Sequence, residues 1–298
     1  MGAAGTFTTG RMKFSVELPI AAPDSLMTCA FAIEAAGFDA CFVTDHPFPP
    51  RNWLTSGGHE TLDPFVALSF AAAATRRIRL HTNCLIPAYR NPYLTAKSIA
   101  TLDAASRGRV ILGVAVGYLE EEFEGLGVPF GERARRLDET IRAMKAAWAD
   151  ELANNVVRPR CAQQPHPPIW AGGNSSAAMR RAIAYGDGWS PFPASPRIAA
   201  AVDTASISDV PTVASAIARF REMAEEAGRT EPLDVCFTPF SHPGHKDIVD
   251  PAAFIDEALG LARIGVTWLA FHLPAPSVAE FCATVEAFGE AVTEVPTR

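Results

Sequence analysis

The chain has 298 residues, of which 48% are hydrophobic and 20% are charged, and its formal net charge at pH 7 is −7. This composition excludes a disordered, collagen-like or low-complexity protein. The sequence has no block rich in lysine and arginine and no run of 18 apolar residues, so we expect neither nucleic-acid binding nor a membrane-spanning helix.

The cysteines and the N-terminus point to a cytoplasmic protein. The six cysteines are irregularly spaced and form no C-x-x-C pair. A disulfide framework is not expected in a chain of this size, and reduced thiols are typical of the cytoplasm. Residues 1–11 lack the apolar segment of a signal peptide, so they are interpreted as a flexible leader before a single domain at residues 12–298.

Short apolar runs alternate with helical patterns along the whole chain. We expect the first helix to be capped by Asp24 and ended by Gly37, and the helix at 251–264 to be ended by Gly265. The loop after the second strand is rich in proline and glycine, which excludes regular structure through most of it. Strands are predicted at 13–19, 40–44, 79–87, 110–116, 169–172, 188–192, 233–239 and 266–273, and helices at 24–36, 63–75, 92–106, 132–149, 177–185, 211–228, 251–264 and 277–292.

Eight strand–helix units on about 285 residues predict an α/β fold of the (β/α)8 TIM-barrel type with insertion loops at the C-terminal face. The near-continuous apolar runs are typical of parallel strands that are covered on both faces. A doubly wound sheet is the alternative, and the number of units favours the barrel. In such a barrel the active site lies at the C-terminal ends of the strands.

The sequence GGNSS follows the fifth predicted strand and precedes a helix. Glycines at Gly172 and Gly173 allow close backbone approach, and Asn174 or Ser175 can cap the helix, whose N-terminus favours a phosphate group. A plain tight turn is the competing interpretation. The phosphate interpretation gains weight because TIM barrels often hold phosphate after a late strand.

Asp45 and His46 follow the second predicted strand. A carboxylate beside an imidazole can transfer protons, orient a polar ring or bind a metal. A helix-capping Asp next to a surface His is the simpler interpretation, and only the position at the end of a strand favours function.

Other polar clusters are weaker candidates. His242 and His245 lie in a Pro/Gly loop without the helical spacing of a metal pair, and His81 is interpreted as a hydrogen-bonded core residue. The EEEFE run at 120–124 is interpreted as the charged start of a helix rather than a catalytic carboxylate pair. The Rossmann, Walker A and nucleophile-elbow glycine motifs are absent where they would be needed.

Several of these segments together resemble a known family. They are TDHPF, TNCLIPAYRNP, GRVILGVAVGYLEEEFEGLGVPFGERARRLDE, PPIWAGGNSS and YGDGWSP, in this order from residue 44 onward. They resemble the bacterial luciferase-like oxidoreductases, and within them the actinobacterial deazaflavin-dependent group. The resemblance covers nearly the whole chain from Met12 and implies coenzyme F420, or alternatively FMN, at the barrel mouth.

The resemblance also implies roles for particular residues. It places a non-proline cis peptide at Asn83–Cys84, which would support one face of the ring, and a ring-contacting pair at Asp45 and His46. It further implies that the backbone at 172–174 binds the phosphate and that Ile86 and Gly117 line the ring.

The sequence also departs from the sugar-phosphate dehydrogenases of this family. They carry an acidic residue directly after the glycine of the fourth strand, where this chain has Tyr118. They also carry a tryptophan soon after the Asp-His pair, whereas the first tryptophan after that pair in this chain is Trp53, further along the loop. Glucose 6-phosphate is therefore not the expected substrate.

The leading hypothesis is an F420-dependent oxidoreductase that moves a hydride between the ring and a small organic substrate. His46 would transfer the proton, Asp45 would fix the ring edge or the imidazole, and Tyr118 offers a further hydroxyl. The alternatives are an FMN-dependent monooxygenase, a metal-dependent hydrolase using Asp45, His46 and His272, and a non-catalytic flavin-binding relative. A homodimer is implied by the resemblance alone.

Overall fold

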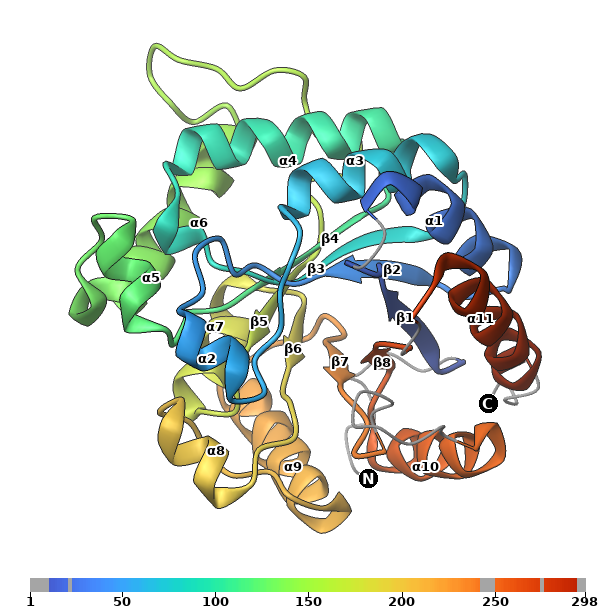
Figure 1. Cartoon of the computed structure of the whole chain (residues 1–298). Helices are drawn as coiled ribbons and strands as arrows, with labels where there is room; N and C mark the ends of the chain where they lie inside the picture. The colour runs from blue at the N-terminus through green and yellow to red at the C-terminus, as the bar shows by residue number, and fades with distance from the viewer. Residues whose placement is uncertain (1–10, 21–22, 242–249, 274–275, 294–298) are drawn as a thin grey trace.

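The computed structural model describes residues 11–20, 23–241, 250–273 and 276–293. Within these residues, eight parallel strands form a closed barrel surrounded by helices (Figure 1). The strands follow chain order around the barrel, and the last pairs with the first, so the predicted TIM barrel is confirmed and the doubly wound sheet is wrong. The strands are β1 (Lys13–Glu17), β2 (Ala40–Val43), β3 (Arg79–Leu85), β4 (Val110–Val114), β5 (Ile169–Gly172), β6 (Gly188–Ser190), β7 (Asp234–Phe237) and β8 (Trp268–Phe271).

The strand positions match the predictions, but most strands end earlier than predicted. The strand predicted at 79–87 ends at Leu85, and the buried residues Ile86 and Pro87 that follow it belong to the barrel mouth. An apolar run in the sequence indicates buried residues, and burial continues into the loops that cover the mouth. The apolar pattern therefore cannot show at which residue the pairing with the neighbouring strand ends.

The barrel interior is filled by alternate residues of each strand. Ser15 Oγ lies 3.4 Å from Nδ1 of the fully buried His81, whose ring packs edge-on against Trp170 at a centroid distance of 4.9 Å. His81 is therefore a hydrogen-bonded core residue, as predicted. Because side chains alternate along a strand, Glu17 also points inward, two residues closer to the mouth than Ser15.

The outer layer of helices packs against the outward-facing strand residues. Phe14 and Val16 of β1, for example, belong to the main hydrophobic core between the barrel and the helices. The helices are α1 (Leu26–Ala35), α2 (Arg51–Thr55), α3 (Pro64–Ala74), α4 (Pro92–Ser106), α5 (Glu120–Gly125), α6 (Arg133–Trp148), α7 (Ser176–Tyr185), α8 (Pro196–Ala201), α9 (Val210–Glu226), α10 (Pro251–Ile264) and α11 (Val278–Thr293).

Helix starts are set by a repeated pair of residue types. Asp63, Asn91 and Asp250 cap α3, α4 and α10 through side-chain oxygens that accept backbone N–H bonds, and a proline occupies the next position each time. Gly265 ends α10 in the left-handed conformation, with φ at 106°, as predicted. These local signals explain why the predicted bounds of α4 and α10 agree with the structure.

One expectation about local structure was wrong, and two short helices were missed. Asp24 does not cap α1: it lies in a short 3-10 turn, η1 (Pro23–Ser25), and the N-cap position is Ser25, whose side chain makes no capping bond. The loop after β2 contains α2, and the stretch after β6 contains α8, although neither helix was predicted. Helices of five or six residues are too short to show a periodic pattern.

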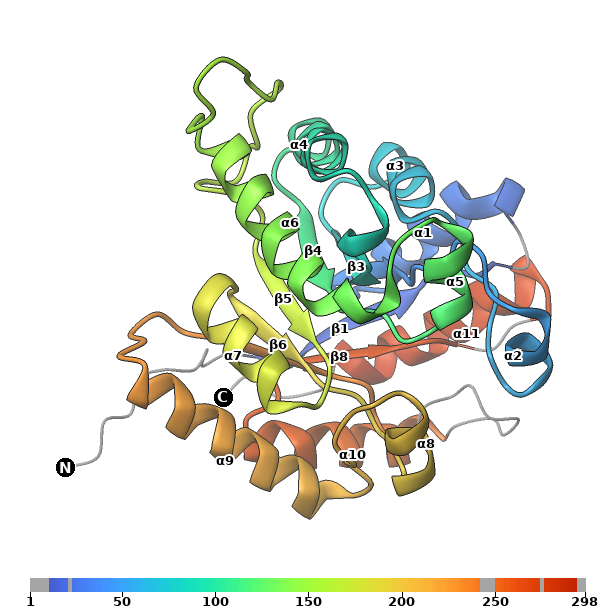
Figure 2. The same ribbon diagram turned by 90° about the vertical axis from the view of Figure 1, so that its left-hand side faces the viewer.

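The insertions after β2, β4 and β6 contain α2, α5 and α8, so they lie at the C-terminal ends of the strands. Figures 1 and 2 place these three helices on the same side of the molecule. Two further 3-10 turns, η2 (Pro87–Tyr89) and η3 (Phe130–Glu132), complete this region. The loops and short helices thus build one end of the barrel into the mouth.

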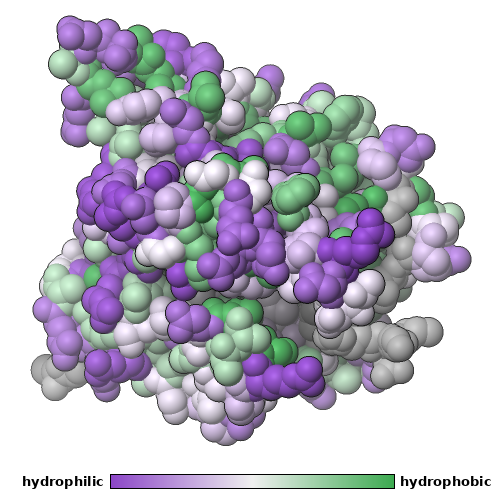
Figure 3. Space-filling model, turned by 60° about the vertical axis from the view of Figure 1, so that its left-hand side comes forward, coloured by the Kyte–Doolittle hydropathy of each residue, from purple (hydrophilic) through white to green (hydrophobic). Residues whose placement is uncertain are grey.

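The described helices include none that is both long and apolar enough to cross a bilayer. On the face shown in Figure 3, hydrophobic side chains lie in small groups among hydrophilic ones. All six cysteines are free. Residues 1–10 of the expected leader, together with His242 and His245, lie outside the described residues.

Candidate active site

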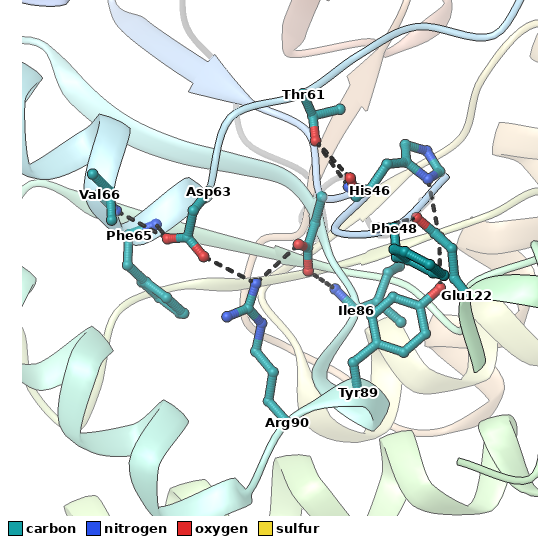
Figure 4. Close-up of polar contacts among 11 residues, drawn as sticks. His46, Phe48, Thr61, Asp63, Phe65, Val66, Ile86, Tyr89, Arg90 and Glu122 are labelled. Atoms are coloured by element: carbon teal, nitrogen blue, oxygen red, sulfur yellow. Dashed lines mark hydrogen bonds and ion pairs between the residues drawn. The ribbon is translucent and has the colours of Figure 1, made fainter. Parts of the chain in front are cut away.

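His46 stands at the mouth of the barrel, just after β2. Its backbone N–H donates to Thr61 Oγ1 at 3.0 Å, and the Thr61 hydroxyl donates back to the His46 carbonyl at 3.2 Å (Figure 4). Its side chain keeps 11% of its surface exposed. The loop after β2 therefore holds the His46 backbone while leaving part of its ring accessible from the mouth.

Glu122 orients the imidazole of His46. Glu122 is fully buried, and its Oε2 lies 3.2 Å from His46 Nδ1 and accepts the Tyr89 hydroxyl at 2.9 Å, while its Oε1 accepts the Phe48 N–H at 3.2 Å (Figure 4). A carboxylate on Nδ1 favours the tautomer that carries its proton there. The lone pair of Nε2 is thus left available for a reacting group.

The interpretation of the EEEFE run therefore needs correction. The run does start a helix, α5, and Glu120 and Glu121 are exposed. Glu122 instead lies in the site, because its position in α5 turns it toward the barrel while its two neighbours face solvent. No sequence pattern singled it out, since three consecutive glutamates look alike until the helix is placed.

Tyr118 and Trp53 lie on the other side of the imidazole. The Tyr118 hydroxyl is 3.3 Å from His46 Nε2, and the Trp53 ring lies against the His46 ring with centroids 4.6 Å apart. Burial, and then the nearby Glu122, raise the pKa of Tyr118, so its hydroxyl stays protonated and can donate. The predicted residues His46 and Tyr118 are brought together, whereas Trp53 joins them through α2, which was not predicted.

Asp45 does not orient His46, so that part of the prediction was wrong. Its carboxylate accepts the Ile86 N–H at 3.0 Å and pairs with Arg90 at 3.0 Å. Burial raises the pKa of Asp45 and the Arg90 charge opposes this effect. Figure 4 shows Arg90 also reaching Asp63, at 3.4 Å. Asp45 thus ties the end of β2 to the segment after β3, and whether it also touches a bound ring stays a prediction.

The third strand is irregular where the resemblance implied it. The peptide bond between Asn83 and Cys84 is cis, as predicted. The pairing of β3 with β4 shifts register between Thr82 and Leu85, so Asn83 and Cys84, which lie between them, form a bulge. Asn83 Oδ1 lies 3.5 Å from Ser190 Oγ. The bulge therefore faces the interior between β3 and β6.

Gly172 and Gly117 stand at positions where any larger side chain would collide with a neighbouring residue. A Cβ atom on Gly172 would lie 2.6 Å from Cys84 Sγ and 3.3 Å from the Cβ of Ala115. A Cβ atom on Gly117, where φ is 79°, would lie 2.9 Å from the Phe123 ring and 3.1 Å from Ile86. These two glycines thus let Cys84 and Phe123 pack directly against the backbone, which a Cβ atom would prevent.

The GGNSS segment is arranged differently from the prediction in one respect. The N–H groups of Gly173 and Asn174 donate to Ser190 O and Thr204 Oγ1, both at 3.1 Å, so they hold the loop itself. The Asn174 side chain is likewise bonded to the backbone of Phe192. The amides left for a phosphate are those at the start of α7, which have no acceptor inside their own helix.

Ser175 rather than Asn174 caps α7. Its hydroxyl accepts the Ala178 N–H at 3.2 Å, and its φ and ψ of −77° and 155° are typical of a cap position. The helix that begins at Ser176 therefore presents its positive end beside Gly172 and Gly173. Phosphate binding at this point stays a prediction.

The described residues contain no group of three or more His, Cys, Asp or Glu side chains that could hold a metal ion. Asp45 is also bonded to Arg90 and Ile86 rather than to His46. The contacts of Asp45 therefore give no support to the metal-dependent hydrolase alternative.

Known proteins resemble parts of this chain in sequence. An uncharacterised protein of Mycobacterium tuberculosis is 42% identical over 139 residues, which cover 43% of this chain and 49% of that protein. An F420-dependent glucose-6-phosphate dehydrogenase of Tsukamurella paurometabola is 36% identical over 139 residues, or 44% of this chain and 40% of that protein. The matched part of the chain thus spans about half of these relatives, or less.

A solved structure shows the same fold. The monooxygenase RslO1 from Streptomyces bottropensis superposes with a TM-score of 0.77 at 20% identity, covering 95% of this chain and 99% of that one. Residues 4–256 match the family described as luciferase-like monooxygenase, which is more than half of the chain. The protein therefore belongs to the luciferase-like monooxygenase family.

Proposed function

We propose that the protein is an F420-dependent oxidoreductase that transfers a hydride between the deazaflavin ring and a small organic substrate. The observation that carries this proposal is the imidazole of His46, which the buried Glu122 holds at one nitrogen and which stays partly exposed at the barrel mouth, where a flat ring is proposed to lie. A proton-transferring group next to a flat site is what hydride transfer to or from a carbonyl requires.

The residues at the mouth fit a flat ring with a phosphate-bearing tail. The bulge at Asn83 and Cys84, which packs directly against Gly172, would support one face of the ring. The start of α7, capped by Ser175, offers amides and a positive dipole end to a phosphate. When bound, the deazaflavin ring supplies or accepts the hydride.

The proposed chemistry of this chain is proton transfer at His46. During oxidation of an alcohol, the hydroxyl proton passes to His46 Nε2 while the adjacent carbon gives up a hydride; in the reverse direction Nε2 returns the proton to the carbonyl oxygen. Glu122 keeps the Nδ1 proton in place, so only Nε2 exchanges protons with the substrate. The Tyr118 hydroxyl, 3.3 Å from Nε2, shares this proton path.

The cofactor assignment to F420 rests on the resemblance to the F420-dependent dehydrogenase, with FMN as the alternative. Titration of the purified protein with each cofactor, followed by fluorescence and absorbance, tests it. Saturable F420 binding at one site per chain is expected. Tight FMN binding without an F420 response would instead favour an FMN-dependent monooxygenase, which the family description also supports.

Substitution of His46 separates an enzyme from a non-catalytic binding protein. His46→Gln is expected to lower turnover by about 100-fold while leaving cofactor affinity within about twofold, since proton transfer contributes this much in many enzymes. Unchanged turnover would contradict the proposed role of His46.

We also propose that the protein forms a homodimer. Exposed apolar side chains on α1 and α3, two helices that pack together at the upper edge of Figure 1, include Phe31 and Phe70, with Val66 between them in sequence. Burial of such a face against a second copy removes it from water. Light scattering should give twice the chain mass for the wild type and the mass of one chain for Phe31→Glu/Phe70→Glu.

A further inference from the structure

Glu17 is a carboxyl group at the barrel mouth that the proton transfer at His46 does not use. It is the last residue of β1 and points inward, because Ser15, two residues earlier, bonds to His81 inside the barrel. The pairing of Val16 with Phe271 places the next residues, Glu17 and His272, side by side at the mouth. Glu17 therefore lies on the opposite side of the mouth from β4 and β5.

Glu17 has no cationic partner among the described residues. Its one hydrogen bond in that part of the chain comes from the Thr44 hydroxyl, at 3.5 Å. Asp45, on the neighbouring strand end, is in contrast paired with Arg90. A partly buried carboxyl group without a counter-charge is costly to ionise, and such groups in a cleft are candidates for function.

A short polar chain connects Glu17 with the rest of the site. Thr44 Oγ1 is 3.4 Å from His59 Nε2, and the His59 ring lies 5.3 Å from that of His46 and 5.4 Å from that of Trp53, measured between centroids. Glu17, Thr44 and His59 thus form one polar wall, and His46 and Tyr118 continue it beyond His59.

The titratable group nearest to Glu17 along these contacts is His59, which is reached through Thr44, and His272 lies on the neighbouring strand end. His46 lies beyond His59, and Lys13 lies deeper on β1, over the Trp268 ring. Burial raises the pKa of Glu17 to about 7, and the Thr44 hydrogen bond opposes this rise. Desolvation in the mouth lowers the pKa of His59, and His46 and His272 lower it further. At neutral pH the polar wall therefore carries either no charge or one negative charge.

We infer that Glu17 determines which substrates enter the mouth: it admits neutral molecules that carry a hydroxyl or carbonyl group and excludes anions. A hydroxyl can donate to the Glu17 carboxylate, and a carbonyl can accept from its protonated form, so either redox state of a neutral substrate finds a partner. An anionic substrate meets a carboxylate that no cation of the described residues neutralises. This inference rests on the proposed function, because it names the substrate class of the same site.

Fluorescence quenching of Trp53 tests the inference without knowledge of the substrate. All five tryptophans are described, and Trp53 is the only one that is not buried. Iodide and acrylamide are, respectively, an anionic and a neutral quencher of tryptophan. At low ionic strength we expect the iodide quenching constant of the wild type, divided by that of acrylamide, to fall about twofold between pH 6 and pH 8.5 as Glu17 ionises.

Four variants identify the residue whose ionisation changes the ratio of iodide to acrylamide quenching. In Glu17→Gln the ratio should stay flat, whereas Glu121→Gln, which removes the same charge from an exposed position, should keep the fall. Thr44→Val should move the midpoint to higher pH, because it removes the hydrogen bond that favours the carboxylate, and it provides a second test if Glu17→Gln fails to fold. His46→Gln should keep the fall. A flat wild-type ratio, or a fall that survives Glu17→Gln and disappears in His46→Gln, would overturn the inference.

The F420 titration keeps this test separate from that of the proposed function. If F420 binds wild type and Glu17→Gln equally and iodide still distinguishes the two proteins, both proposals stand. If F420 binds but Glu17→Gln leaves the pH dependence of iodide quenching unchanged, the selection by Glu17 is refuted while the proposed function remains. If F420 does not bind, the proposed function fails, whatever the quenching shows.

Discussion

Glu122 Oε2 lies 3.2 Å from His46 Nδ1, although the two residues are 76 positions apart in the chain. One comes from the first turn of α5 and the other from the loop after β2. The same carboxylate also receives the Tyr89 hydroxyl from η2. A single buried group thus fixes three segments that follow three successive strands, and it sets which nitrogen of His46 faces the mouth.

Replacement of Glu122 by Gln should damage both catalysis and stability. The amide cannot accept all three bonds that the carboxylate accepts, so one buried partner loses its acceptor, at a cost of about 1–3 kcal/mol. Turnover should fall at least about tenfold because the His46 tautomer is no longer fixed. Urea unfolding and steady-state kinetics check the two effects, and Glu121→Gln serves as the control. Turnover equal to that of the control would refute the role of Glu122.

Tyr118→Phe should separate the hydroxyl from the ring. The aromatic ring still packs against His46 and Trp53, but the donor 3.3 Å from Nε2 is lost. We expect turnover to fall about tenfold, with cofactor affinity within about twofold of the wild type. A pH–rate profile of the variant provides the readout. An effect on cofactor affinity alone would mean that Tyr118 only shapes the pocket.

Ser176→Asp tests the phosphate site at α7. A carboxylate in the first turn favours the helix dipole, so the free energy of unfolding should stay equal or rise by about 0.5 kcal/mol. The same charge repels a phosphate, so F420 affinity should fall about tenfold or more, and less at high salt. Thr101→Asp, on the exposed face of α4, is the control for added charge. Unchanged F420 affinity would mean that the phosphate does not bind at the start of α7.

The raised pKa of Glu17 predicts how stability depends on pH. Burial raises this pKa from its ordinary value of 4.5 to about 7, so the folded chain holds the proton more tightly than the unfolded chain. The contribution of Glu17 to stability is full below about pH 4.5 and is lost as the pH rises to about 7. Since Glu17 is only partly buried, we expect about 1–2 kcal/mol, and Glu17→Gln should remove this slope. Urea unfolding from pH 4.5 to pH 8 measures it, and equal slopes in both proteins would contradict the assignment.

The fold could be predicted from the sequence because its signals are local. Asp63, Asn91 and Asp250, each followed by proline, mark helix starts, and apolar runs mark the strands between them. The eightfold repeat then leaves few alternatives to a closed barrel. The cis bond at Asn83 came from the resemblance and not from any local pattern.

The candidate site could be predicted only in part, because its key contacts join distant segments. His46 and Tyr118 were found because each follows a strand, which places it at the mouth. Glu122, Trp53 and Glu17 were missed as site residues, since their roles depend on how α5, α2 and β1 turn relative to the barrel. The predicted contact of Asp45 with the imidazole was wrong for the same reason: adjacency in sequence to His46 does not bring its carboxylate to that ring.

The most direct test of the account is F420 titration of the wild type beside Gly172→Ala and Gly131→Ala. In the first variant the new methyl would lie 2.6 Å from Cys84 Sγ and would displace the bulge that is proposed to support the ring, whereas in the second it meets nothing within 4 Å. We predict saturable binding at one site per chain for the wild type and Gly131→Ala, and at least about tenfold weaker binding for Gly172→Ala. No binding of F420 or FMN to the folded wild type, or equal binding by all three proteins, would contradict the account.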